Sequence, residues 1–152
     1  MIIYKRGVKD STEMRMTITN IEYENNRVYV IGDTRIGNLK GEWCDKATPV
    51  LGEMYFFELN ICDLDKKEIS VIDDEQFCSS VKFSDNQVQF KGICEEIDDV
   101  YVIRICGDWI EMIAIENDDF SIKKGDAVLF SISYDRIGIY PYEVGYKVVE
   151  VE

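Results

Sequence analysis

The residues best suited to chemistry are the four carboxylates of the segment Glu95-Glu96-Ile97-Asp98-Asp99. Paired carboxylates can act as acid and base in glycoside hydrolysis, and clustered carboxylates can bind a divalent cation. The segment lacks the glycine and the terminal glutamate of an EF-hand loop. We therefore interpret it first as a solvated hairpin loop or a partner-binding loop. A carboxylate-dependent or metal-dependent enzyme is the weakest alternative.

Other common catalytic chemistries lack their residues in this chain. Histidine is absent, which removes the usual base of hydrolytic triads and of cysteine–histidine pairs. The glycines are spread singly, and no Gly-x-Gly-x-x-Gly, Walker-type or Gly-x-Ser-x-Gly motif occurs. The sequence therefore predicts a protein that is not an enzyme, with no catalytic residue, no cofactor and no metal.

The cysteines and the apolar runs indicate a location. The five cysteines are odd in number, and none forms a Cys-x-x-Cys pair. Most of them fall in apolar segments, so we expect buried, reduced thiols and no structural zinc. The N-terminal residues lack the apolar core of a signal peptide, and no apolar run approaches the roughly 18 residues that cross a bilayer. We expect a cytoplasmic protein that does not bind membranes.

Charge gives the strongest indication of function. The chain has 30 acidic and 17 basic residues, a net charge of −13, and a pI near 4.4. Such a charge repels the phosphates of nucleic acids and favours cationic partners. The segment from Glu95 to Asp119 contains a single basic residue, Arg104, and we predict that its acidic side chains bind a cationic protein. They are Glu95, Glu96, Asp98, Asp99, Asp108, Glu111, Glu116, Asp118 and Asp119.

The alternative for these residues is that long surface loops are simply hydrophilic. Aromatic residues offer a second candidate contact. Tyr140-Pro141-Tyr142 lies between Gly138 and Gly145, which predicts an exposed turn. Tyrosine provides a large contact area with few rotatable bonds, so Tyr140 and Tyr142 are candidate anchors for a partner. Trp43 and Trp109 are instead expected in the core.

The elements that position these residues are predicted from an internal repeat. Three matches occur in the same order in both halves of the chain, which predicts a duplicated module with residues 1–75 as the first copy and 76–152 as the second. The matches are Tyr23–Gly32 with Phe83–Gly92, Gly41–Trp43 with Gly107–Trp109, and Gly52–Asn60 with Gly125–Ser133.

Each module is predicted to consist of antiparallel strands. Asn25-Asn26 and Asp85-Asn86 separate alternating segments and suit tight hairpin turns. Gly52 and Gly125 precede the long apolar segments 54–61 and 127–134. Single helical turns are expected at 74–80 and 116–123. The sequence therefore predicts an all-β protein in which two small related antiparallel modules pack into one compact unit, as OB-like barrels or as sandwich halves.

Two resemblances follow. The strand order and the module length resemble those of OB-type barrels, which implies the alternative function of binding nucleic acid or an oligosaccharide. In being small, acidic and without catalytic motifs, the chain resembles the immunity proteins and antitoxins that bacteria use against basic nuclease toxins. That resemblance implies a protein-binding inhibitor whose acidic surface occupies the phosphate track of the nuclease.

Overall fold

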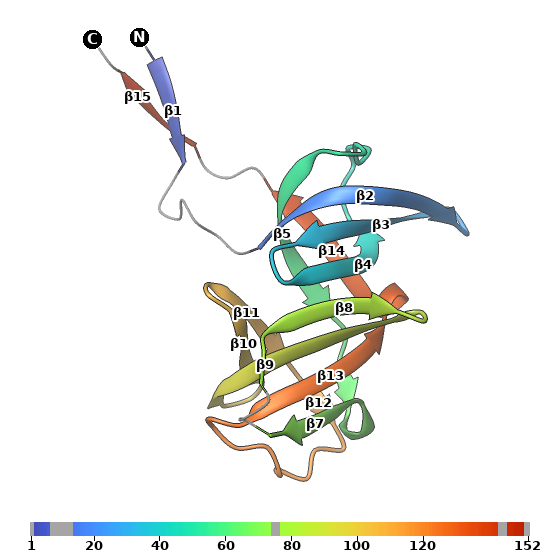
Figure 1. Cartoon of the computed structure of the whole chain (residues 1–152), viewed down its shortest axis with the longest axis vertical. Coiled ribbons are helices and arrows are strands. Elements are labelled where there is room, and N and C mark those ends of the chain that lie inside the picture. The colour runs from blue at the N-terminus through green and yellow to red at the C-terminus, as the bar shows by residue number, and fades with distance from the viewer. Residues whose placement is uncertain (1, 7–13, 74–76, 143–145, 151–152) are drawn as a thin grey trace.

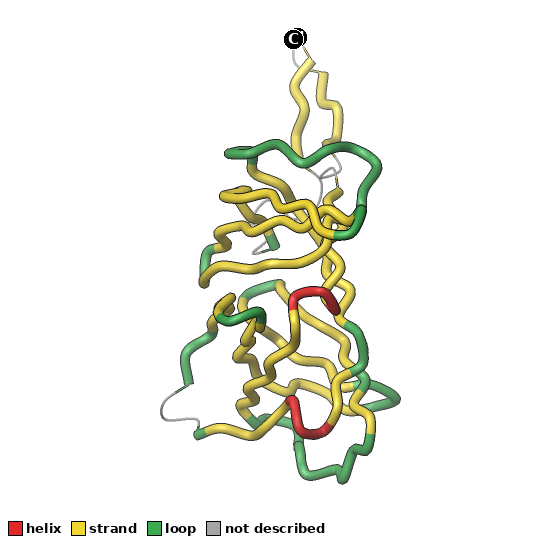
Figure 2. The backbone as a smooth tube through the Cα atoms, turned by 90° about the vertical axis from the view of Figure 1, so that its right-hand side faces the viewer, coloured by secondary structure: helices red, strands yellow, loops and turns green. Residues whose placement is uncertain are grey.

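The computed structural model describes residues 2–6, 14–73, 77–142 and 146–150 (Figure 1). In these residues the regular elements are β-strands and two short 3-10 turns, which confirms the all-β prediction. The strands form two barrels, one above the other in Figures 1 and 2. An antiparallel ribbon of β1 (Ile2–Arg6) and β15 (Tyr146–Glu150) extends from the first barrel.

The first barrel consists of β2 (Arg15–Glu24), β3 (Arg27–Thr34), β4 (Gly37–Trp43), β5 (Met54–Ile61) and β14 (Ile137–Tyr142). The strand order is β2-β3-β4-β14-β5, and β5 pairs again with β2, so the barrel is closed. Neighbouring strands are antiparallel except β4 and β14, which are parallel. This arrangement is compatible with an OB-like barrel.

The second barrel is built around β7 (Ile69–Ile72), β9 (Gln87–Ile97), β10 (Tyr101–Cys106), β11 (Trp109–Ile113) and β13 (Ala127–Ser133). β9, β10 and β11 form an antiparallel meander, while β13 pairs with both β9 and β7. A short parallel ladder between β6 (Leu64–Asp65) and β12 (Ile115–Glu116) links the end of β11 to the start of β7. This two-residue ladder brings the β11 edge of the second barrel close to its β7 edge.

Each barrel is completed by a strand from the other half of the chain. β14 lies in residues 76–152 but pairs with β4 and β5 of the first barrel. β6 and β7 lie in residues 1–75 but pair with β12 and β13 of the second. The two halves of the sequence therefore exchange strands in space, and the boundary near residue 75 does not separate the two barrels.

The local turn predictions agree with the structure. Asn25, Asn26, Asp85 and Asn86 have φ values of 51°, 65°, 51° and 65°, so both hairpins have the same two-residue turn. The second of these hairpins joins β8 (Ser80–Ser84) to β9.

The turns at Gly52 and Gly125 also correspond to each other. Both glycines have positive φ, and their backbone nitrogens donate to the carbonyl oxygens of Ile18 at 2.8 Å and Cys94 at 2.7 Å. The two acceptor carbonyls lie in β2 and β9, so these strands correspond in the structure. The sequence match instead pairs the β2–β3 hairpin with the β8–β9 hairpin, which aligns β2 with β8. Gly41 lies within β4, whereas Gly107 lies in the β10–β11 turn, so the two tryptophan segments occupy different places. An origin by duplication stays a prediction.

The helical turns occur elsewhere than expected. Residues 77–79 and 116–123 are not helical, and 74–76 lie outside the described residues. The 3-10 turns are instead η1 (Lys66–Glu68), between β6 and β7, and η3 (Tyr134–Arg136), between β13 and β14. η1 is held by its own side chains: Asp65 Oδ1 accepts from Lys67 N at 2.9 Å, and Glu68 Oε1 accepts from Asp65 N at 2.8 Å. So short a turn leaves no apolar periodicity in the sequence.

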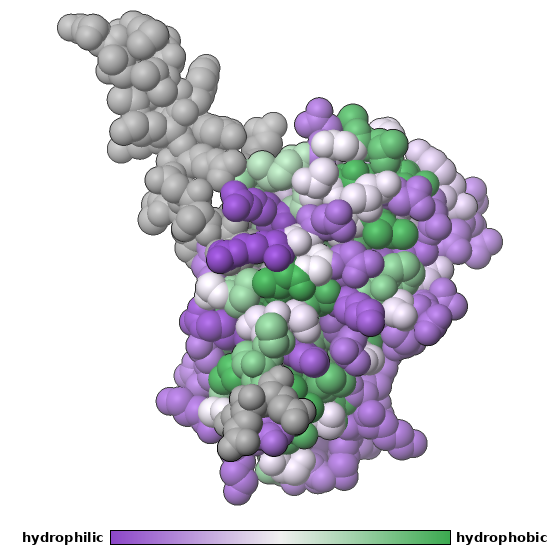
Figure 3. Space-filling model, viewed as in Figure 1, coloured by the Kyte–Doolittle hydropathy of each residue, from purple (hydrophilic) through white to green (hydrophobic). Residues whose placement is uncertain are grey.

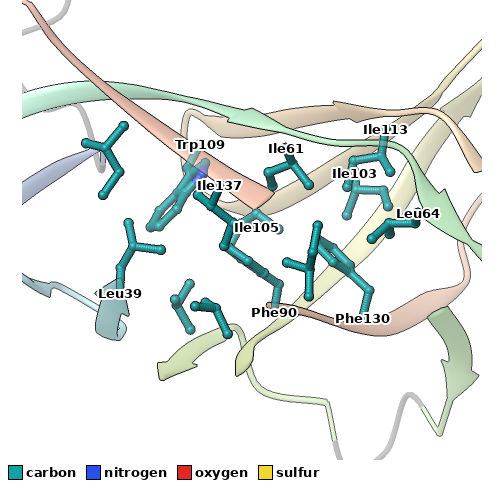
Figure 4. Close-up of a cluster of buried hydrophobic side chains, with 14 of the residues drawn as sticks. Leu39, Ile61, Leu64, Phe90, Ile103, Ile105, Trp109, Ile113, Phe130 and Ile137 are labelled. Atoms are coloured by element: carbon teal, nitrogen blue, oxygen red, sulfur yellow. The ribbon is translucent and has the colours of Figure 1, made fainter. Parts of the chain in front are cut away.

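The two barrels share one hydrophobic core (Figure 4). Trp43 and Trp109 are both buried, which confirms their predicted core position. The Trp109 ring meets Phe57 of β5 edge-on, with ring centroids 5.5 Å apart, and Phe90 of β9 at 6.4 Å. Phe90 in turn stacks on Phe130 at 4.9 Å. Trp109 therefore joins the interior of the second barrel to a strand of the first.

The contact between β4 and β8 provides a stability prediction. Gly37 has φ +140°, and a Cβ there would lie 1.7 Å from the carbonyl oxygen of Val81. We expect Gly37→Ala to lower the free energy of unfolding by at least about 3 kcal/mol, because backbone must move where the barrels meet. Gly52→Ala is the matched control: Gly52 has φ +85° but nothing within 4 Å of a Cβ, so only about 1 kcal/mol should be lost. Equal losses in urea denaturation would contradict this view of the barrel contact.

Candidate functional site

The exposed acidic side chains gather at one end of the second barrel. Tyr101 pairs with Ile97 on one side and Ile113 on the other, so the β9–β10 turn lies beside the end of β11. Four of the predicted acids there are exposed and form no ion pair or side-chain hydrogen bond with the described residues. We call these four the acidic end; they are Glu96, Asp98, Asp99 and Glu116.

Three further predicted acids at this end bind groups of the protein itself. Arg104 donates to both oxygens of Glu95, with Nη2 and Oε2 2.9 Å apart, and this bond lowers the pKa of Glu95. Asp119 pairs with Lys66 at 2.6 Å, which lowers its pKa to about 2. Asp118 accepts hydrogen bonds from the Tyr101 hydroxyl and from Phe120 N, the latter at 2.9 Å. Glu95 therefore links β9 to β10, and Asp118 and Asp119 hold the loop after β12 in place.

Asp108 and Glu111 lie away from the acidic end. Asp108 follows the opposite end of β10, in the β10–β11 turn. Glu111 is 6% exposed, and its Oε1 accepts a hydrogen bond from Trp109 Nε1 at 3.0 Å. Burial raises the pKa of Glu111 from an ordinary 4.5 to about 8, so it is mainly neutral at pH 7. The prediction that Glu111 belongs to a charged surface is therefore wrong, because its side chain faces inward like those of Trp109 and Ile113.

Tyr140 and Tyr142 lie in a strand rather than in the predicted turn. Both belong to β14 and pair with Glu58 and Phe56 of β5. Pro141 is tolerated because β4 pairs with Gly138 and Ile139, and the last three residues of β14 extend beyond that pairing. Gly145 lies outside the described residues.

The two tyrosines are nevertheless exposed, at 45% and 40%. The Tyr142 ring packs against Phe56, with centroids 6.4 Å apart, and the neighbouring Cys44 raises the pKa of Tyr140. β14 belongs to the first barrel, whereas the β9–β10 turn lies at the lower left of the second (Figure 1). The structure therefore does not bring the predicted acidic and aromatic residues together into one surface.

The outer face of β3 and β4 is covered in part by β8 and η3. In OB folds the corresponding strands bind nucleic acids and oligosaccharides. Here Lys40 of β4 is 5% exposed, forms an ion pair with Glu22, and has its ammonium nitrogen 3.8 Å from the centroid of the Tyr134 ring. Phe83 of β8 lies on the same ammonium, at 5.3 Å. Neither the spacing nor the types of these residues predict the buried cation or its aromatic neighbours.

Tyr134 belongs to η3, which Figure 2 shows at the junction of the barrels. Its hydroxyl donates to Glu24 Oε2 at 2.9 Å, and this bond raises the pKa of Tyr134 to about 12. The Tyr134 ring also meets Tyr29 of β3 edge-on at 5.1 Å. η3 therefore covers the part of the β3–β4 face around Lys40 through aromatic and charged contacts.

The cysteines are less buried than expected. Cys94 is buried, Cys44 and Cys106 are half-buried, and Cys62 and Cys78 are exposed, since both lie just outside strands. In the described ranges no group of three or more acidic or cysteine side chains is arranged to hold a metal ion. No helix in that part of the chain is long and apolar enough to cross a membrane.

Comparison with known protein families, with curated proteins and with solved structures finds no match to this chain.

The buried carboxyl of Glu111 leads to a prediction about pH. Its pKa is higher in the folded state, so the stability that its protonated form contributes is present below pH 4.5 and is lost as the pH rises through about 8. Glu111→Gln stays neutral and keeps an acceptor for Trp109. We expect its melting temperature to match that of the wild type near pH 5 and to exceed it increasingly as the pH rises to 9. The corresponding gain in the free energy of unfolding should reach several kcal/mol, at about 1.4 kcal/mol per pKa unit.

The matched control is Glu96→Gln, because Glu96 is exposed at the acidic end. Its melting temperature should differ from that of the wild type by a similar amount at every pH. A Glu111→Gln curve parallel to the wild type across this range would show that Glu111 titrates normally.

Proposed function

We propose that this protein is a small acidic binding module that captures a cationic protein partner in the cytoplasm, in the manner of an immunity protein or antitoxin that inhibits a basic toxin nuclease. The observation that carries the proposal is the acidic end. Its four carboxylates are exposed and have no basic neighbour bonded to them among the described residues, while the acids around them are neutralised internally.

The charges of the acidic end suit the steering of a partner. Loop acids that pair with Arg104 and Lys66 hold the backbone in place, so the free carboxylates are presented on an ordered support. Aligned charges of one sign speed the encounter with an oppositely charged protein, and they do so most at low ionic strength. The overall charge of −13 adds to this field.

Binding of nucleic acid has less support. Affinity for nucleic acid depends largely on lysine and arginine side chains that neutralise phosphates. On the β3–β4 face, Lys40 is paired with Glu22 and covered by Tyr134. Burial of part of the β3–β4 face leaves less of the surface that OB-like folds use for nucleic acids and oligosaccharides.

Tyr140 and Tyr142 are proposed as a second, separate contact. Their exposed rings are held by the β5–β14 pairing, so little side-chain freedom is lost on binding. A partner that reaches from the acidic end to β14 would have to span both barrels.

Charge removal at the acidic end tests the proposal. The partner is first isolated on the tagged protein from a lysate of the source cells, and its association rate is then measured over a range of salt concentrations. Converting Glu96, Asp98, Asp99 and Glu116 to Gln or Asn should slow association about ten-fold at low salt. The difference should shrink as the screening length falls to about 8 Å at physiological ionic strength. The melting temperature should stay equal or rise slightly, because exposed carboxylates contribute little to folding.

The matched control removes the same charge elsewhere. Asp33, Asp45, Glu53 and Asp85 are also exposed, and converting them to Asn or Gln changes the net charge equally. This control should slow association less. If the two variants behave alike at every salt concentration, only the net charge matters and the acidic end is not a docking surface.

A further inference from the structure

A pocket of about 300 Å³ lies between β5 of the first barrel and β11 of the second. This volume is at the lower end of the range for small-ligand pockets, which is roughly 300–1,000 Å³. The pocket lies apart from the acidic end, near the middle of the molecule. Its walls include Met14, Glu58, Asn60, Ile110, Glu111 and Met112.

The carboxyl group of Glu111 is the unusual feature of this pocket. The residue is more than nine-tenths buried, and Trp109 Nε1 occupies one of its oxygens at 3.0 Å. Its other oxygen has no hydrogen-bond partner among the described residues. Buried polar atoms are normally paired, because an unpaired one loses its hydration without compensation. A carboxyl oxygen without a partner beside a pocket therefore points to a polar ligand, which donates to the ionised carboxyl or accepts from the protonated one.

The charges around the pocket indicate the sign of that ligand. Glu58 lies on the facing strand and acts on Glu111 electrostatically, so two acidic groups share the site. Among the described residues, no lysine or arginine lines it. A cation would relieve the repulsion between the carboxyls and would favour the ionised form of Glu111. The amide of Asn60 provides a further polar group at the same wall.

The remaining walls suit an aliphatic chain. Met112 is 71% exposed and Ile110 is 37% exposed, and both project from β11 beside the pocket. Hydrophobic side chains are exposed among polar ones across the middle of the face shown in Figure 3. Methionine is flexible and polarisable, so Met14 and Met112 can adapt to the methylene groups of a ligand.

We propose that this pocket binds a lysine or arginine side chain of the partner, with the cationic head on Glu111 and Glu58 and the aliphatic stem between Met14 and Met112. Because the ligand is a group of the cationic partner, the inference rests on the proposed function. The pocket supplies a specific anchor for the partner, whereas the charges of the acidic end act at longer range. Anchors of this kind govern the dissociation rate rather than the encounter.

Titration with short peptides tests the pocket directly. The full chain, labelled at the methionine methyl groups and the tryptophan indole nitrogens, is titrated with acetyl-Gly-Lys-Gly-amide and with the corresponding arginine peptide. Saturable shifts are expected at the Met112 methyl group and the Trp109 indole. The peptide with norleucine, which has the stem without the charge, should bind at least about ten-fold more weakly, the size expected for one charge-assisted hydrogen bond.

Two variants assign the effect to Glu111. Glu111→Gln keeps the hydrogen bond to Trp109 and should weaken the lysine peptide about ten-fold. Glu53→Gln removes an exposed acid outside the acidic end and the pocket, and it should leave peptide binding unchanged. The inference is overturned if no peptide binds, if norleucine binds as well as lysine, or if Glu111→Gln binds like the wild type.

The outcome can be separated from that of the proposed function. If the peptides do not bind but the protein partner still associates in a salt-dependent way through the acidic end, the pocket is excluded and the proposed function stands. If the peptides bind and removal of the four acids leaves association unchanged, the pocket is retained and the acidic end is not the docking surface.

Discussion

The pairing of β14 between β4 and β5 is the constraint on which the rest of the structure depends. β14 follows β13 in the chain, so the second barrel must form close to the first for this strand to reach its place. Conversely, β7 follows strands of the first barrel in the chain but pairs with β13 of the second. Neither barrel has all its strands within one half of the sequence, and the shared contact of Trp109 with Phe57 buries the junction.

The exchange also decides which surfaces remain open. Packing of η3 and β8 on the first barrel encloses Lys40 and covers part of the β3–β4 face. The end of the second barrel that carries the β9–β10 turn stays exposed, together with its carboxylates. At the junction itself, β5 and β11 leave a pocket with an inward carboxyl. The fold therefore covers part of the face that OB-like barrels use for ligands. It leaves two sites, the acidic end and the pocket, where acidic groups favour positive charge.

Local features could be predicted from the sequence, and long-range ones could not. Turns at Asn25-Asn26 and Asp85-Asn86 depend on residues that accept positive φ, so composition alone indicates them. Which half of the chain supplies the strand that closes each barrel depends on contacts between distant segments. A single sequence gives no signal for such contacts. Glu111 is an intermediate case. It alternates with the buried Trp109 and Ile113, so strand periodicity places it inward, although its charge suggests the surface.

Differential scanning calorimetry tests the strand exchange most directly. Because each barrel is completed by the other half of the chain, the account predicts a single transition whose calorimetric enthalpy equals its van't Hoff enthalpy. Two resolved transitions, or a calorimetric enthalpy well above the van't Hoff value, would show that the barrels unfold separately and would contradict the shared closing strands.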